Sequence, residues 1–78
     1  MTVFEFNRLK VVVQEEVIFD NGTFVLNEVK RELIFDVYEL FDFFVKVSYN
    51  LSNNGYSAIE AFAINDWPKF FKSPPPTP

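Results

Sequence analysis

The sequence predicts a small α+β protein, with an antiparallel sheet of about four strands in two hairpins and one main helix. Three observations predict this fold. Alternating apolar and polar residues are interrupted by turn residues at two places, and residues 27–40 have helical periodicity. In addition, 49% of the 78 residues are hydrophobic, which is enough for a packed core. An all-β meander or barrel is the alternative, because the helical stretch also shows strand periodicity.

The first hairpin is predicted around Asn21-Gly22. Residues 9–19 alternate between apolar and polar side chains, and their β-branched residues favour a strand. Residues 23–26 resume the apolar pattern after the turn. An Asn-Gly pair between two apolar runs is typical of a type I′ turn, in which both central residues have positive φ. A helix is the alternative for the first of these runs, since its apolar residues also recur every four positions.

The main helix is expected within the stretch from Asn27 to Leu40. On a helical wheel, Val29, Leu33 and Val37 share one face, and the first residue of the stretch is an acceptable N-cap. A strand stays open as an alternative, because Leu33, Phe35 and Val37 would share one face of a strand. Phe35 distinguishes the two, since a helix places its ring among acidic residues. An exposed ring would indicate a binding surface, and a buried ring would indicate a strand.

The remaining elements follow from simpler patterns. Residues 43–49 and 56–64 are short apolar runs around a loop rich in Asn, Ser and Gly, which predicts a second hairpin. Residues 67–71 group their aromatic side chains at helical spacing after an aspartate, which predicts one capped helical turn. The chain therefore divides into one domain over residues 1–72 and an extended proline-rich tail over residues 73–78.

Composition excludes several classes of function. The chain has no Cys and no His, which excludes disulfides, zinc bound by Cys or His, thiol nucleophiles and Ser-His catalysis. Seven scattered basic residues against eleven acidic ones give a net charge of −4, so we expect neither direct nucleic-acid binding nor membrane binding. We expect no cofactor and no metal. The absence of a signal peptide or a long apolar segment predicts a cytoplasmic protein.

An acidic ladder is the first candidate site. Its members are Glu28, Glu32, Asp36, Glu39 and Asp42. The structural interpretation is a solvated face that keeps an aromatic-rich element soluble. The functional interpretations are a surface that docks a basic partner, or a carboxylate site for catalysis or metal binding. Spacing alone does not show convergent oxygens, so the docking surface is the stronger of the functional interpretations.

The aromatic residues are the second candidate. Eleven Phe are more than a core of this size requires, and surplus apolar surface typically marks a contact with a partner or a second copy of the chain. The aromatic candidates for partner binding are Phe35, Trp67, Phe70 and Phe71.

These observations predict a small, acidic, non-enzymatic protein that binds another protein with a basic surface. The sharper form is an inhibitor or immunity-type protein whose acidic face occludes a basic site on its target. A homodimer formed through the surplus aromatics is compatible with this hypothesis. The alternative is a carrier that holds an apolar small ligand between sheet and helix. A carboxylate-based enzyme is the third and weakest hypothesis, because a domain this small has little volume in which to bury a catalytic acid.

Overall fold

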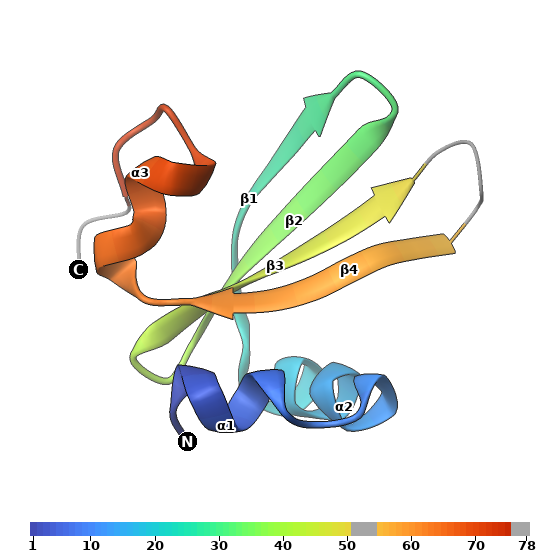
Figure 1. The fold of residues 1–78 in the computed structure, drawn as a ribbon, viewed down its shortest axis with the longest axis vertical. Helices are drawn as coiled ribbons and strands as arrows, with labels where there is room; N and C mark the ends of the chain where they lie inside the picture. Colours follow the sequence, from blue (N-terminus) through green and yellow to red (C-terminus); the bar gives the residue numbers. More distant parts are fainter. Residues whose placement is uncertain (51–54, 76–78) are drawn as a thin grey trace.

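The structure is a computed structural model that describes residues 1–50 and 55–75. Four strands form one sheet, with two helices before it and two short helical segments after it (Figure 1). In chain order the elements are α1 (Val3–Asn7), α2 (Val11–Asn21), β1 (Thr23–Lys30), β2 (Leu33–Leu40), β3 (Phe43–Asn50), β4 (Gly55–Phe62), the 3-10 segment η1 (Ile64–Asp66) and α3 (Trp67–Phe70). The prediction of a small α+β fold is confirmed, and the all-β alternative is not favoured. No helix in the described part of the chain is long and apolar enough to cross a membrane.

The strands form an open antiparallel sheet in the order β1-β2-β3-β4, so each strand pairs with its neighbours in sequence. Residues 31–32 and 41–42 are two-residue turns that join the first three strands. Such tight hairpins favour turns with positive φ, because the turn then matches the twist of the strands. Arg31 and Phe41, the first residues of these turns, each have a φ of 58°. Both turns therefore place a bulky side chain in the region that glycine prefers.

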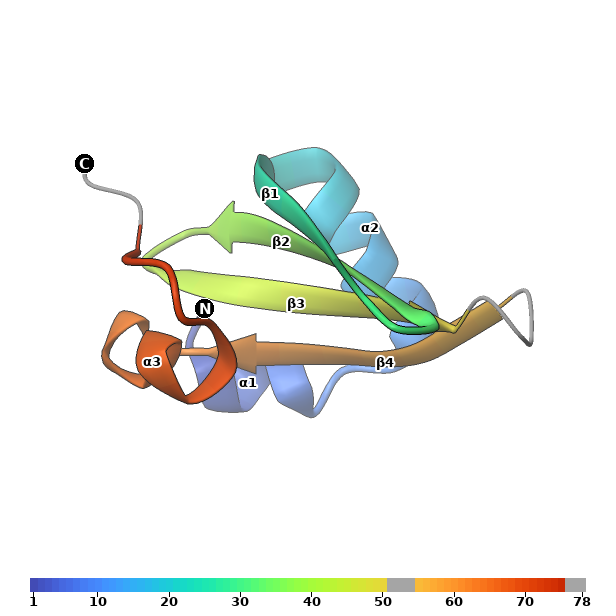
Figure 2. The same cartoon turned by 90° about the horizontal axis from the view of Figure 1, so that it is seen from above.

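Each face of the sheet is covered by one end of the chain (Figure 2). We call the face under α1 and α2 the helical face, and the face under η1 and α3 the C-terminal face. The buried residues of the helical face are Leu40, Phe43, Val45, Val47 and Ala61, with Phe6 of α1 packed on them. The buried residues of the C-terminal face are Val37, Phe44 and Phe62, with Trp67 and Phe71 packed on them.

β3 contributes to both clusters. Phe43, Phe44 and Val45 are consecutive and all buried, because successive side chains of a strand point to opposite faces of the sheet. The rings of Phe43 and Phe6 have centroids 6.0 Å apart on the helical face. The ring of Phe44 meets Trp67 edge to face at 5.1 Å on the other. Aromatic pairs in such geometries contribute about 0.5–1.5 kcal/mol beyond the burial of their area.

α1 is a short helix fixed at both ends. Thr2 and Glu5 form a capping box, in which each side chain accepts a hydrogen bond from the backbone N–H of the other. These hydrogen bonds lower the pKa of Glu5. At the other end, the Asn7 amide donates to the carbonyl of Ala61 (3.2 Å) and accepts from its N–H (2.9 Å). Asn7 therefore occupies part of the free edge of β4.

The strand predicted over residues 9–19 is wrong, because most of this segment belongs to α2. Gln14, Val17 and Ile18, spaced as one face of a helix, lie toward the core. Gln14 is 4% exposed, and its amide donates a hydrogen bond to the carbonyl of Phe6 at 3.0 Å. Packing on the sheet thus outweighs the strand preference of the β-branched residues.

The type I′ turn predicted at Asn21-Gly22 is also wrong. Asn21 is the last residue of α2, and Gly22 is its C-cap with a φ of −80°. The Asn21 amide donates to the carbonyl of Val17 at 3.2 Å, and the Gly22 N–H donates to the carbonyl of Ile18 at 2.7 Å. A Cβ on Gly22 would lie 2.6 Å from that carbonyl oxygen. Gly22 is therefore required by the close approach of the chain to α2, and not by positive φ.

The main helix predicted within residues 27–40 is wrong, and the strand alternative is correct. The segment forms the second half of β1, a turn and β2. Phe35 is half-buried in β2, where it pairs in register with Glu28. β2 carries apolar residues on both faces, such as Val37 and Tyr38, because both faces are covered. A strand with two apolar faces loses strict alternation, and its pattern then resembles a helix.

The second predicted hairpin is confirmed, since β3 and β4 pair antiparallel. The helical turn predicted over residues 67–71 corresponds to α3. Asp66 precedes α3 as expected, but its side chain makes no capping hydrogen bond and instead pairs with Lys69 at 3.3 Å. The turn-rich loop over residues 51–54 and the last three residues of the predicted tail lie outside the described residues.

We expect Arg31→Gly to be more stable than Arg31→Ala by about 1 kcal/mol, because glycine reaches positive φ without a Cβ clash. Urea unfolding followed by the fluorescence of the buried Trp67 measures the difference. The neighbouring Glu32 does not have positive φ, so Glu32→Gly should be less stable than Glu32→Ala. Equal stability of the two Arg31 variants would contradict a strained turn.

Candidate functional site

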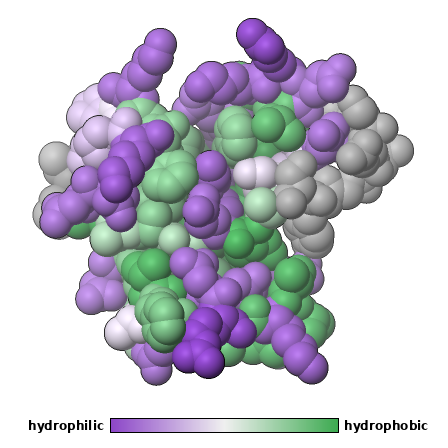
Figure 3. All heavy atoms as spheres, viewed as in Figure 1, coloured by the Kyte–Doolittle hydropathy of each residue, from purple (hydrophilic) through white to green (hydrophobic). Residues whose placement is uncertain are grey.

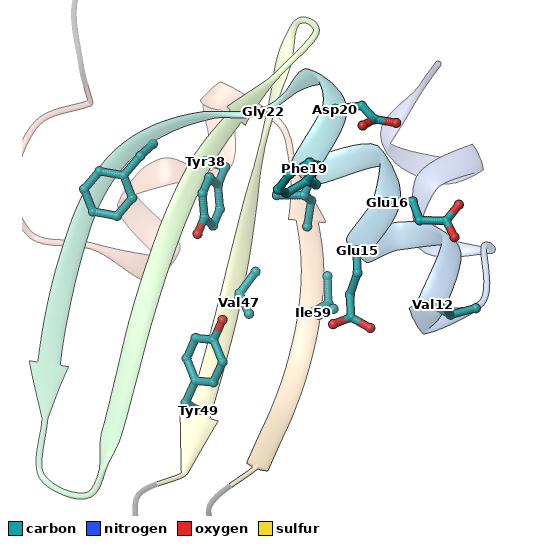
Figure 4. Close-up of a pocket in the computed structure, with 12 residues that line it drawn as sticks. Val12, Glu15, Glu16, Phe19, Asp20, Gly22, Tyr38, Val47, Tyr49 and Ile59 are labelled. Atoms are coloured by element: carbon teal, nitrogen blue, oxygen red, sulfur yellow. The ribbon is translucent and has the colours of Figure 1, made fainter.

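An open groove lies on the helical face, between α2 and a part of the sheet that α2 leaves uncovered (Figure 4). Its volume of about 720 Å³ is within the usual range of ligand sites. The lining residues from α2 are Val12, Glu15, Glu16, Ile18, Phe19 and Asp20. The others are Gly22, Phe24, Tyr38, Val47, Tyr49 and Ile59. We call this site the α2 groove.

The sheet side of the α2 groove is largely apolar. Val47 is buried, and Tyr38, Tyr49 and Ile59 are half-buried members of the helical-face cluster. Figure 4 shows these side chains on neighbouring strands, opposite Phe19 of α2. Burial raises the pKa of the Tyr38 and Tyr49 hydroxyls, and the negative charge of Asp36 raises it further. The groove thus combines apolar surface with two neutral hydroxyl groups.

Three apolar side chains at the α2 groove are largely exposed to solvent. Phe19 is 89% exposed, Val12 59% and Phe24 55%. The ring of Phe24 lies edge to face on that of Tyr38, with centroids 5.8 Å apart. Figure 3 shows apolar surface also at the lower end of the molecule, where Figure 1 places α1 and α2. Phe19 contributes almost nothing to the core, so the fold does not explain it.

The α2 groove is negatively charged. Its lining contains the carboxylates of Glu15, Glu16 and Asp20, and none of the lining residues given above is Lys or Arg. The sequence of α2 contains no basic residue at all. Asp20 lies in the last turn of α2, where a negative charge opposes the helix dipole at a cost of about 0.3–1 kcal/mol. A positively charged partner in the groove would relieve this repulsion.

The C-terminal face has a smaller hollow of about 170 Å³ around Lys46. The Lys46 Nζ lies 5.1 Å from the ring centre of Phe35 and 4.5 Å from that of Phe70, so the ammonium interacts with two aromatic rings. Two further lysines and one glutamate also line this Lys46 hollow. The two hollows therefore differ in charge, with acids at the α2 groove and mostly lysines here.

The structure does not bring the acidic ladder together. Glu28 lies in β1, Asp36 and Glu39 lie in β2, and Glu32 and Asp42 lie in the two turns. Glu28 and Phe35 line the Lys46 hollow. Asp36 lies on the opposite face, since strand side chains alternate, and accepts a hydrogen bond from Asn27 at 2.8 Å. In a sheet these residues point to both sides, whereas a helix would have aligned them.

The aromatic candidates near the C-terminus are mostly interior residues. Trp67 is 1% exposed and Phe71 5%, and both cover the C-terminal face. The Trp67 Nε1 donates a hydrogen bond to the carbonyl of Ser73 at 2.7 Å. Phe70 is half-buried and lines the Lys46 hollow. Of these three aromatics, Phe70 is the most accessible to a partner.

Sequence reasoning missed the α2 groove because it assigned a strand to this segment. The helical alternative contained the needed signal. Leu9, Val13 and Val17 recur every four residues, and a stripe at this spacing leaves Phe19 about 200° away from Val17 around the helix. An aromatic residue on the polar side of an amphipathic helix, next to Glu16, indicates a contact surface.

None of the protein-family models, curated proteins or solved structures compared with the chain matches it. Within residues 1–50 and 55–75, no group of three acidic side chains is placed to hold a metal ion. We therefore infer the function from the geometry and charge of the two faces.

The raised pKa of Tyr38 and Tyr49 predicts a loss of stability at high pH. An unfolded tyrosine ionises at about pH 10, whereas these two keep their protons to higher pH in the folded chain. The stability that these two protonated hydroxyls contribute is therefore fully present below the unfolded pKa. It is lost as the pH rises through the folded pKa. We expect Tyr38→Phe and Tyr49→Phe each to reduce this loss in urea unfolding at high pH. If both variants lose as much stability at high pH as the unsubstituted chain, these two tyrosines are not its cause.

Proposed function

We propose that the chain is a non-enzymatic protein-binding module and that its partner docks on the α2 groove. The observation that carries the proposal is Phe19, whose side chain is 89% exposed beside an open apolar groove. Aromatic residues, Phe included, are enriched in protein–protein interfaces relative to the rest of the surface. A partner that buries this ring would gain about 1.5–3 kcal/mol from its apolar surface.

The grouping of the exposed apolar residues supports the proposal further. A single exposed apolar side chain is ordinary on a protein surface. Val12, Phe19 and Phe24, however, all line the same groove and are all more than half exposed. Apolar side chains gathered around a hollow and bordered by charged groups are typical of a protein contact surface.

The sharper form of the proposal is an inhibitor or immunity-type protein that occludes a basic site on its target. The acidic surface in this proposal is the α2 groove, with Glu15, Glu16 and Asp20, and not the ladder predicted from the sequence. The net charge of −4 supports attraction to a basic target over a distance. Complementary charge accelerates association and disfavours incorrect partners.

A second copy of the chain is a less suitable partner for this groove. A symmetric dimer through the α2 groove would place the acidic side chains of one copy against those of the other. Like charges at an interface cost free energy. Catalysis is not part of the proposal, because the ladder carboxylates are distributed over both faces of the sheet and two turns.

A carrier of an apolar small ligand is the second candidate. Two features of the α2 groove favour it. The groove has a volume of about 720 Å³, and it lies between a helix and the sheet, where the sequence analysis places the ligand of a carrier. The groove is open to solvent, however, and its rim is acidic, whereas a carrier site typically encloses most of its ligand. Protein docking therefore fits the geometry better.

Site-specific photo-crosslinking in the source cells tests both candidates. Phe19 would be replaced by p-benzoylphenylalanine, and the matched control would carry it at Phe4, which is 69% exposed on α1. We expect a discrete protein adduct from position 19 and much less from position 4. An adduct with the mass of a small molecule would favour the carrier. Equal crosslinking from both positions would contradict docking at the groove.

A further inference from the structure

The exposed side of α2 has the residue spacing of a helix–helix contact. Val12, Glu16 and Phe19 occupy positions i, i+4 and i+7 of the helix. All three are exposed, and all three line the α2 groove. Residues at this spacing share one face of a helix, which is the pattern of side chains in helix–helix contacts. We call these three residues the α2 seam.

The groove provides a second wall for a segment that lies along the α2 seam. Tyr38 and Tyr49 of the sheet are half-buried and form part of the opposite side. A helix placed there would contact α2 with one side and the tyrosine rings with another. Its apolar face would be covered and its opposite face would stay in water, which is how amphipathic helices bind in apolar grooves.

The negative charge of the groove favours a positively charged occupant. Glu15, Glu16 and Asp20 border the apolar surface, and a helix with Lys or Arg beside its apolar stripe would place positive charges near them. Positive charge near Asp20 would also offset its repulsion from the negative end of the α2 dipole. A second copy of the chain would bring further carboxylates instead.

We propose that the α2 groove binds a cationic amphipathic helix of the target protein, packed along Val12, Glu16 and Phe19. This inference rests on the proposed docking function and specifies the secondary structure and charge of the bound segment. The partner helix supplies apolar side chains at i, i+3 or i+4 and i+7, with basic residues flanking them.

Fluorescence anisotropy with synthetic peptides and the full chain tests this proposal. The probe is a labelled peptide of Leu and Lys, roughly 18 residues or about five helical turns long, with all Leu on one helical face. One control peptide has the same composition in an order that scatters Leu around the helix. A second control peptide has Glu in place of Lys. At about 0.15 M salt, we expect the first peptide to bind about tenfold more tightly than either control.

Matched variants locate the site. Phe19→Asp and Glu16→Lys should each weaken binding of the first peptide by about tenfold. Phe4→Asp and Glu39→Lys change exposed residues outside the α2 groove and should leave binding unchanged. Because all four side chains are exposed, circular dichroism should show an unaltered fold for each variant.

The outcomes separate this inference from the proposed function. Equal binding of the ordered and scrambled peptides, or equal weakening by Glu39→Lys and Glu16→Lys, would overturn the helical occupant. A dimer in sedimentation that Phe19→Asp dissociates would also overturn it, since the occupant of the groove would then be a second copy of the chain. A protein crosslink from position 19 without peptide binding would overturn this inference and leave the docking function standing. If position 19 gives no protein crosslink and the peptide does not bind, both the docking function and the helical occupant are overturned.

Discussion

The central strand β3 must bury apolar side chains on both faces of the sheet, and the rest of the structure follows from this constraint. Phe43 and Val45 lie on the helical face, and Phe44 between them lies on the C-terminal face. Burial of each aromatic side chain contributes about 1.5–3 kcal/mol, so neither face can be left open. The chain meets this requirement with its two ends: Phe6 of α1 covers one face, and Trp67 of α3 covers the other.

The cover on the helical face is incomplete, and the α2 groove is the result. A helix is about 10 Å across, whereas an eight-residue strand such as β3 is about 27 Å long. Figure 1 shows the β1–β2 and β3–β4 hairpins extending beyond α1 and α2. A sequence selected only for folding would place polar residues beside the exposed part of the face. Phe19 and Phe24 lie there instead, together with Asp20, whose charge opposes the α2 dipole. This combination is explained more simply by a partner than by the fold.

The sequence was informative where one pattern dominated and misleading where two patterns overlapped. The β3–β4 hairpin and the helical turn at Trp67 were predicted because their aromatic and β-branched residues fit a single periodicity. Residues 27–40 were assigned a helix because β2 is apolar on both faces. Asn21-Gly22 suggested a hairpin, since local turn preference does not reveal that Gly22 must approach α2 closely.

The candidate site depended on these assignments. Once the ladder lies on strands its acids diverge, and once residues 11–21 form a helix Phe19 and Glu16 become neighbours on an exposed side.

Amide chemical-shift mapping by NMR tests the central claim that the incompletely covered helical face is the binding surface. The isotope-labelled chain would be titrated with the ordered Leu and Lys peptide. We expect the shifts to concentrate on α2 and on the strand positions of Tyr38, Val47 and Tyr49, while the amides of Lys69 and Phe70 in α3 do not shift. Shifts centred on α3, or equal in size on α2 and α3, would contradict this claim.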